Sequence, residues 1–219
     1  MINKDSDSLP DNEGEDRSEL SWTETEWEKY LADHEASVIE YLKHYDQLES
    51  TPDRLDEVAR RLNWELDALS DEDDDLDDDD LDSDFDADWE PYTLHRNPVY
   101  ISSKALYLSL TANWERIAAH PDRISAALGL AMQGSLFRGR EQSLQAIQAL
   151  DLGDYALAIC FFKRALRELN VTLAHLGAEN IGDPQLFSRY RDYALPRLFD
   201  LREIWLRVMS ECREANGDE

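Results

Sequence analysis

The sequence is poor in cysteine, contains no long apolar run and is short of basic residues. Its two cysteines, Cys160 and Cys212, are too few and too far apart to form a disulfide framework or a cysteine metal site. Both fall on apolar helical faces, so we expect two buried thiols. No apolar run approaches the length of a membrane span, and the first residues lack the apolar stretch of a secretory signal. A cytoplasmic protein with no membrane contact is therefore expected.

The shortage of basic residues is confined to one part of the chain. Residues 1–90 hold 34 of the 49 acidic residues and 7 of the 22 basic ones, so they carry the whole net charge of −27. Residues 91–219 hold 15 residues of each sign and are neutral. This distribution argues against direct binding of nucleic acid or of an anionic membrane surface.

The acidic part divides into three segments. Residues 1–20 are polar and rich in Asp, Glu and Ser, which predicts a disordered tail. Residues 21–70 open with a capping box of Ser21 and Glu24 and carry two apolar stripes at alternating spacings of four and three, which predicts an acidic helical hairpin. The stripes are Trp27, Leu31, His34, Val38, Tyr41, Tyr45 and Leu48, then Leu55, Ala59, Leu62, Leu66 and Leu69. Residues 71–90 contain 14 acids and predict an extended low-complexity linker.

The neutral part, residues 91–219, has the periodicity of a helical bundle. Helices are expected over about 98–119, 122–150, 154–176 and from 184 onward, with Pro196 kinking or splitting the last one. Three glycines in the second helix predict a kink or break between residues 133 and 140. The third helix is apolar almost all round, which predicts a central position. With no strand pattern anywhere, the fold class is all-α: an N-terminal acidic helical hairpin and a C-terminal bundle of four or five helices.

One stretch, residues 139–170, resembles a single tetratricopeptide unit. The matching residues are Ala146, Gly153, Tyr155, Ala158, Phe162 and Ala165. Gln142, Gln145 and Asn170 depart from that family's pattern, and no second copy occurs, whereas such repeats need about three copies to bury a core. The resemblance implies a helical hairpin and no particular ligand.

The sequence contains no complete catalytic or metal-binding pattern. None of the five histidines pairs with Cys or His at metal-ligand spacing, and there is no glycine-rich phosphate loop. Arg116 and His120 resemble the Arg and His pair of helical HEPN-type ribonucleases, although the gap between them is shorter than in that family. No cofactor or metal is expected, and catalytic residues are not assigned.

Three groups of residues are candidates for binding a partner. In the acidic linker, Leu81, Phe85 and Trp89 recur every four residues, as in acidic segments that fold onto a partner. Apolar residues of the predicted hairpin, Trp27, Leu31 and Val38, provide a surface for docking or self-association. A basic face, comprising Arg138, Arg140, Lys163, Arg164 and Arg167, is suited to the acidic segment or to an anionic partner. The simpler interpretation is a solubilising linker and ordinary surface charge.

These observations favour a noncatalytic interaction or adaptor protein that binds another protein through helical faces and an acidic segment. A basic protein is the partner that the acidic segment would select. An acidic decoy or chaperone for basic partners is the first alternative, and its binding should weaken steeply with salt. An enzyme or cofactor binder with a site inside the C-terminal bundle is the second, and convergent polar groups there would favour it.

Overall fold

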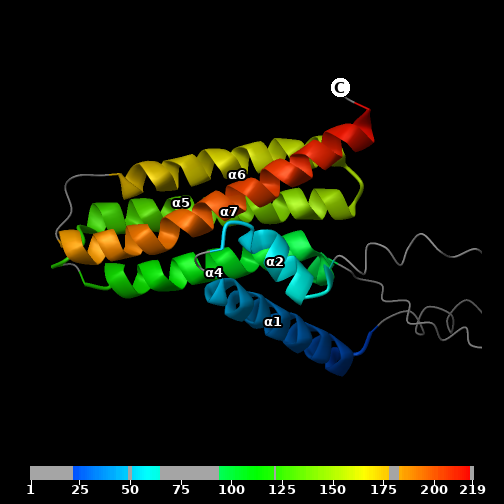
Figure 1. The fold of residues 1–219 in the computed structure, drawn as a ribbon, viewed down its shortest axis with the longest axis horizontal. Coiled ribbons are helices and arrows are strands. Elements are labelled where there is room, and N and C mark those ends of the chain that lie inside the picture. The colour runs from blue at the N-terminus through cyan, green and yellow to red at the C-terminus, as the bar shows by residue number, and fades with distance from the viewer. Residues whose placement is uncertain (1–21, 49–50, 65–93, 121, 178–182, 218–219) are drawn as a thin grey trace, which may run out of the picture.

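The structure is a computed structural model that describes residues 22–48, 51–64, 94–120, 122–177 and 183–217. Within these ranges every regular element is a helix, which confirms the all-α prediction. The elements are α1 (Glu24–Gln47), α2 (Arg54–Arg61), the 3-10 helix η1 (Leu94–Arg96), α4 (Pro98–Ala118), α5 (Ala126–Asp151), α6 (Tyr155–Leu176) and α7 (Pro184–Asn216) (Figure 1). Among the helices of the described ranges, none combines the length and apolar character that crossing a membrane requires. The predicted tail 1–20 and linker 71–90 lie outside the described residues.

Short polar motifs set where the helices begin. The capping box of α1 is formed by Thr23 and Glu26: Thr23 Oγ1 accepts from the Glu26 amide, and the Glu26 carboxylate accepts from the Thr23 amide at 2.6 Å. This box lies two residues later than the predicted one. At the start of α4, Asn97 Oδ1 accepts from the Val99 amide at 2.8 Å, and proline follows at the first helical position. Asp183 caps α7 in the same way.

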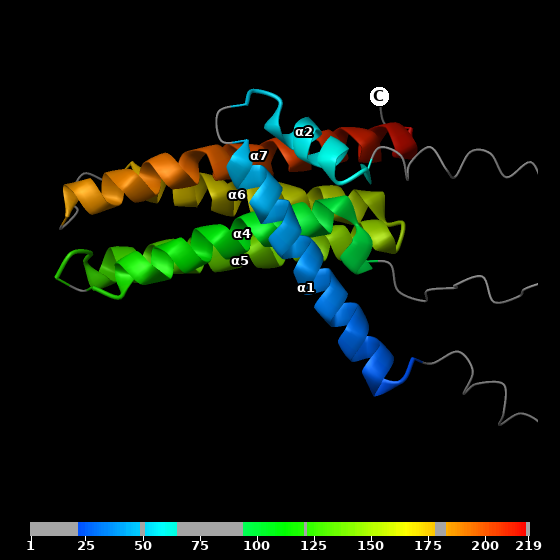
Figure 2. The same cartoon turned by 60° about the horizontal axis from the view of Figure 1, so that its bottom comes forward.

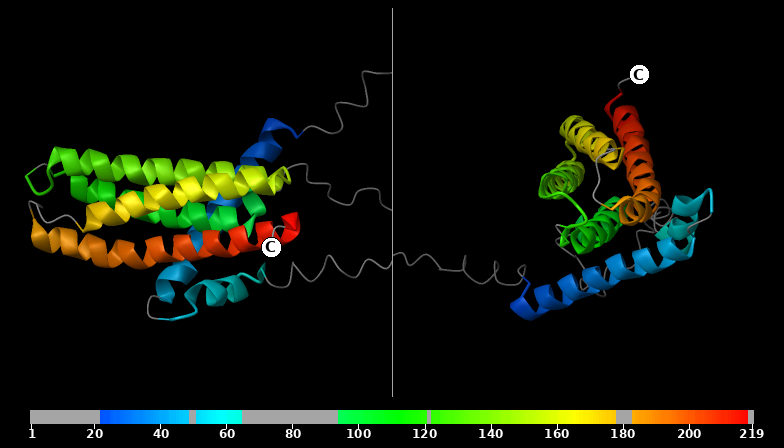
Figure 3. Two further views of the ribbon diagram at one scale, coloured as in Figure 1. Left: turned by 90° about the horizontal axis from the view of Figure 1, so that it is seen from above. Right: turned by 90° about the vertical axis from the view of Figure 1, so that its left-hand side faces the viewer.

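Helices α4 to α7 form an antiparallel bundle. α4 packs on α5, α5 on α6, α6 on α7 and α7 on α4, so the four helices close a ring that Figure 3 shows end-on. Large side chains fill the centre, with Tyr107, Trp114, Phe162 and Trp205 fully buried. α4 is the most enclosed helix, because α1 covers its outer side as well.

Three expectations about this bundle are wrong. α6 is not central: it buries one face, while Leu157 on another face is 43% exposed, because α6 packs mainly on α5 and α7. Cys160 is exposed on that outer side, whereas Cys212 is buried as expected. α5 is one helix through residues 133–140, so the predicted break there is wrong. Gly139 instead serves close packing, because a Cβ at this position would lie 2.4 Å from Tyr107 Oη of α4. Pro196 lies inside α7, so the helix is not split there, and the kink stays a prediction.

The N-terminal helices dock on the bundle. α1 crosses α4 obliquely and α2 turns back towards α7 (Figure 2). Val38, Tyr41 and Tyr45 of α1 and Val58 of α2 belong to the same apolar core as the bundle helices. α2 ends at Arg61, and Leu62 of the predicted second stripe follows it and packs against the core. Leu66 and Leu69 of that stripe lie outside the described residues.

Candidate functional site

A pocket of about 420 Å³ lies between the end of α4 and the beginning of α7. The helices alternate in direction, so the last turns of α4 and the first turns of α7 meet at one end of the bundle, on the left in Figure 1. The pocket, called the cationic cleft below, is lined by Asn113, Arg116, Ile117, His120, Arg123, Leu186, Arg189, Tyr190 and Tyr193. Its volume is that of a small-ligand site.

Positive charge dominates the cationic cleft. Arg116 comes from α4, Arg123 from the turn before α5 and Arg189 from α7, and all three are exposed to solvent. Among the described residues, no carboxylate lines the pocket and none of the three guanidinium groups forms an ion pair. A guanidinium group presents five N–H donors in a planar fork that matches carboxylate and phosphate oxygens. The cleft is therefore built to attract an anion.

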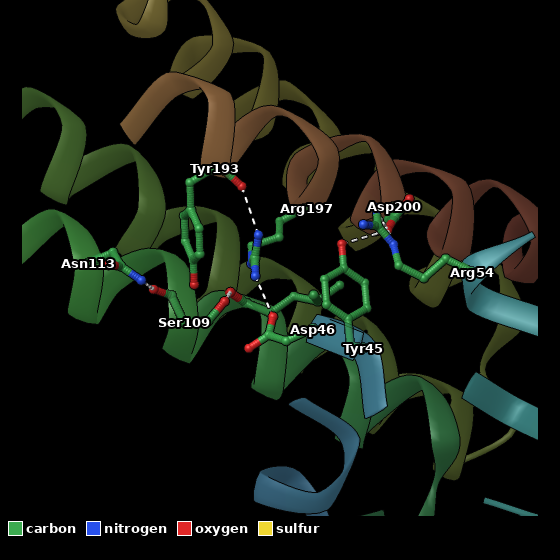
Figure 4. A network of polar contacts seen from close by, with 9 residues as sticks. Tyr45, Asp46, Arg54, Ser109, Asn113, Tyr193, Arg197 and Asp200 are labelled. Carbon is green, nitrogen blue, oxygen red and sulfur yellow. Dashed lines mark hydrogen bonds and ion pairs between the residues drawn. The ribbon is translucent and has the colours of Figure 1, made fainter. Parts of the chain in front are cut away.

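A short chain of hydrogen bonds orients one of these arginines. Asn113 Nδ2 donates to the Ser109 carbonyl at 3.2 Å, one turn earlier on α4 (Figure 4). The Oδ1 atom of Asn113 accepts from Arg116 Nη2 at 2.5 Å. Since this contact uses one of the five N–H groups of Arg116, the others remain available to a ligand in the cleft.

Aromatic side chains form the other wall of the cleft. Tyr190 is 2% exposed, and its hydroxyl donates to the Leu110 carbonyl at 3.2 Å while its ring lies 5.0 Å from that of Trp114. Tyr193, half-buried, has its ring 3.6 Å from the guanidinium carbon of Arg197. Both rings are held from behind, so this wall is rigid and mostly apolar.

Behind Tyr193 lies a second polar site, where the N-terminal helices bind α7 (Figure 4). We call it the hairpin latch, and its members are Tyr45, Asp46, Arg54, Arg197 and Asp200. Arg197 donates to the Asp46 carboxylate and, at 3.0 Å, to the Tyr193 carbonyl. Asp200 Oδ2 accepts from Tyr45 Oη at 2.6 Å and from Arg54 Nε at 2.9 Å.

The hairpin latch buries two positive charges. Arg54 is 7% exposed and Arg197 is 4% exposed, so each needs its carboxylate to offset the loss of hydration. Burial, followed by the hydrogen bond to Asp200, raises the pKa of Tyr45 well above its ordinary value of about 10, so its hydroxyl stays protonated and donates. Each buried guanidinium group of the latch thus has a carboxylate partner, although Arg197 Nε is buried without a hydrogen-bond partner among the described residues. The latch is structural. It is joined to the cleft because Arg197 stacks on Tyr193, which lines the cleft.

A third polar cluster surrounds His34 of α1. Its Nδ1 atom lies 3.1 Å from the His95 carbonyl, and its Nε2 atom lies 2.8 Å from Lys104 Nζ. Burial, together with the charge of Lys104, lowers the pKa of His34 to about 4. The neutral ring then accepts from Lys104 at Nε2 and donates to the carbonyl from Nδ1, so both nitrogens are used in holding α1 to η1 and α4.

The comparisons with protein-family models, with curated proteins and with solved structures each find no match for this chain. The likenesses to tetratricopeptide units and to HEPN-type ribonucleases therefore stay local. Among the described residues, no group of three or more His, Cys, Asp or Glu side chains is placed to hold a metal ion. The functional argument rests on the chemistry of the cationic cleft.

The apolar candidates on α1 do not all lie at the surface. Trp27 is 36% exposed and its ring lies 4.7 Å from that of Trp22, while Leu31 is 45% exposed. Val38 is 2% exposed and belongs to the core. The three apolar residues of the acidic linker, Leu81, Phe85 and Trp89, lie outside the described residues.

The predicted basic face is present but largely paired. Glu168 of α6 accepts from Arg138 Nε of α5 at 2.9 Å and lies 3.8 Å from Arg167 Nη2. Arg140 lies 3.4 Å from Glu141. Lys163 and Arg164 are exposed on α6. Since acids sit within this face, it attracts an anion less strongly than the cleft does.

Sequence reasoning singled out Arg116 with His120, but it did not connect this pair with Arg123 or Arg189. The signal was available in the predicted topology. In an up-and-down bundle, the end of the first helix and the beginning of the fourth lie at the same end. Applying that rule to residues 116–123 and 189–193 would have brought these side chains together.

Proposed function

We propose that this chain is a noncatalytic interaction protein that holds an anionic group of another protein in the cationic cleft. The observation that carries the proposal is that Arg116, Arg123 and Arg189 line one pocket, which no carboxylate of the described residues lines. Like charges placed together repel one another and weaken the fold, so such a cluster is expected where a ligand supplies the opposite charge.

The cleft adds a second binding site to the adaptor hypothesis, and this site prefers a partner of the opposite charge to the one that the acidic residues prefer. The acidic residues 1–90, with a net charge of −27, suit a basic partner. The cleft suits an acidic or phosphorylated segment, because guanidinium groups bind carboxylates and phosphates through paired hydrogen bonds. An adaptor of this kind would hold two partners of opposite charge, and both contacts should weaken with salt.

The test compares two variants that lose the same charge. In the cleft variant, Arg116, Arg123 and Arg189 are replaced by Gln, and in the control variant, Lys163, Arg164 and Arg202 are replaced by Gln. All six side chains are exposed, so both variants should stay folded. Fluorescence anisotropy measures binding of two labelled peptides, one rich in Glu and one phosphorylated, to the full-length chain.

We expect at least one peptide to bind the natural chain and the control variant, and to bind the cleft variant at least 10-fold more weakly. Equal weakening in both variants would trace the binding to overall charge and reject the cleft as a site. Absence of binding by both peptides at low salt would reject the proposed function itself.

A second candidate function is phosphoester chemistry, because Arg116 and His120 lie one turn apart and line the same pocket. The arginine would stabilise charge on phosphate and the histidine would transfer a proton. A proton-transferring histidine is normally oriented by a further hydrogen bond, and within the described residues none is made by the His120 ring. Hydrolysis of an aryl phosphodiester by the natural chain, abolished in His120→Gln with ligand binding retained, would establish this activity in place of simple binding.

A further inference from the structure

We infer that the group held in the cationic cleft is a phosphate monoester carried on an aromatic ring, the chemistry of a phosphotyrosine side chain. This inference rests on the proposed function and specifies its ligand. Three features of the cleft support it: the number of guanidinium groups, the size of the pocket and the nature of its second wall.

The charge of the cleft favours phosphate over carboxylate. Arg116, Arg123 and Arg189 line one pocket and come from three separate segments. A carboxylate has a single negative charge and two oxygens, which one or two guanidinium groups satisfy. A phosphate monoester carries a charge of about −1.5 to −2 at pH 7 and has three strong acceptor oxygens, which matches three guanidinium groups.

The size of the cleft exceeds that of a phosphate alone. An ion with four oxygens needs about the space of four waters, on the order of 120 Å³. The pocket has about 420 Å³, so a bound phosphate would leave most of it for the group to which the phosphate is attached.

The remaining space has an apolar, partly aromatic lining. Ile117 lines the pocket from α4, and Leu186, Tyr190 and Tyr193 line it from α7. Aromatic rings pack well against such a wall, in offset-stacked or edge-to-face arrangements. An aryl phosphate therefore contacts both the arginines and the apolar wall of the cleft. Inorganic phosphate contacts the arginines alone, and an aliphatic carboxylate makes only part of each set of contacts.

The experiment measures the affinity of the full-length chain for five probes at one ionic strength. The probes are inorganic phosphate, phenyl phosphate, and three peptides that differ at one central position, which is phosphotyrosine, phosphoserine or glutamate. The variants are Arg189→Gln and Leu186→Ala in the cleft, with Arg202→Gln on the same helix as the control. Retention of the natural melting temperature shows that each variant is folded.

The expected order of affinity places phenyl phosphate and the phosphotyrosine peptide at least 5-fold above inorganic phosphate and the phosphoserine peptide, with the glutamate peptide weakest. Arg189→Gln should weaken every phosphorylated probe at least 10-fold. Leu186→Ala should weaken the aryl probes alone, and Arg202→Gln should change nothing beyond 2-fold. Tighter binding of the peptide than of phenyl phosphate identifies a protein side chain as the source, and the reverse identifies a free aryl phosphate.

Two results would overturn the inference while leaving the proposed function standing. Equal affinity for phenyl phosphate and inorganic phosphate would show that the aromatic ring of the ligand does not contribute to binding. Glutamate peptide binding as tight as that of the phosphotyrosine peptide, and lost in Arg189→Gln, would make the cleft a carboxylate site. Failure of every probe to bind would reject both the inference and the proposed function.

Discussion

Two groups of arginines lie next to each other on this protein in opposite states. In the hairpin latch, Arg54 and Arg197 are almost fully buried and each contacts a carboxylate that comes from a different helix. In the cationic cleft, the arginines are exposed and form no ion pair within the described part of the chain. The two settings share helix α7, where Arg189, Tyr193 and Arg197 follow one another at successive turns of one face.

The difference follows from the cost of removing charge from water. A buried guanidinium without its counter-ion destabilises the fold by several kcal/mol, so burial is tolerated only where an acid is supplied. An exposed guanidinium keeps its hydration and tolerates the absence of an acid, which leaves its hydrogen-bonding capacity for a ligand. The same residue type is therefore structural in the latch and available for binding in the cleft.

The largest effect is expected from breaking the latch at Asp200. Asp200→Ala takes the carboxylate away from two buried groups, Tyr45 Oη and the Arg54 guanidinium, and should lower the free energy of unfolding by about 3–5 kcal/mol in urea titrations. The combination Arg54→Met with Asp200→Leu replaces the ion pair by apolar groups and should recover most of this loss. A loss below about 1 kcal/mol in Asp200→Ala would show that the latch does not hold the N-terminal helices in place.

A smaller effect is expected at Asp46, which is itself about half-exposed. Asp46→Ala should lower the free energy of unfolding by about 1–3 kcal/mol, because Arg197 loses a hydrogen bond between charged groups. Arg197 also holds Tyr193, so the variant should weaken phenyl phosphate binding a few-fold. Glu28→Ala, which removes an exposed acid from the same helix, should change neither property. Unchanged binding in Asp46→Ala would mean that latch and cleft are energetically independent.

His34 is a third kind of basic residue beside the paired arginines of the latch and the exposed arginines of the cleft: it is buried and stays neutral. The folded-state pKa of His34, about 4, lies below the ordinary 6.5. Between these two pH values the ring is therefore protonated in the unfolded chain and neutral in the folded chain. The contribution of the neutral His34 ring to the free energy of unfolding is fully present above pH 6.5 and is lost as the pH falls towards 4. Two further titratable groups, Lys104 and His95, face the His34 ring, and the pKa of His95 is also lowered.

Between pH 7.5 and 5.5, we expect the melting temperature of the natural chain to fall by about 2–4 °C more than that of His34→Gln. Thermal melts followed by circular dichroism check this difference. Parallel curves for the two chains would show that protonation of His34 does not oppose folding.

The smallest effect on stability is expected in the cleft. Arg189→Gln should change the free energy of unfolding by less than about 0.5 kcal/mol, because the side chain is exposed. Its melting temperature should, however, no longer rise when phenyl phosphate is added, as that of the natural chain should. A destabilisation as large as that of Asp200→Ala would show that the arginine is structural and end the contrast between the two sites.

Much of the fold follows from local sequence. The apolar periodicity indicates helices, and short polar motifs before Pro98 and Pro184 mark where two of them begin, because a side-chain oxygen and a proline meet the needs of a helix start wherever they occur. The position of α6 could not be predicted in this way. An apolar pattern on several faces does not say which faces a neighbour will cover, and α6 lies at the corner of the ring with an outer side exposed.

The sequence by itself determined the all-α class and the separation of an acidic part from a neutral one, since both depend on composition and on spacing along one chain. The tertiary structure alone decided which charges pair. Glu168 pairs with Arg138, and Asp200 joins Arg54 to Tyr45, across separations that no local pattern reports. The same packing left Arg116, Arg123 and Arg189 around one pocket that no acid from the described part of the chain lines. Ion pairing depends on distances of a few ångströms between helices, and only the packed bundle sets those distances.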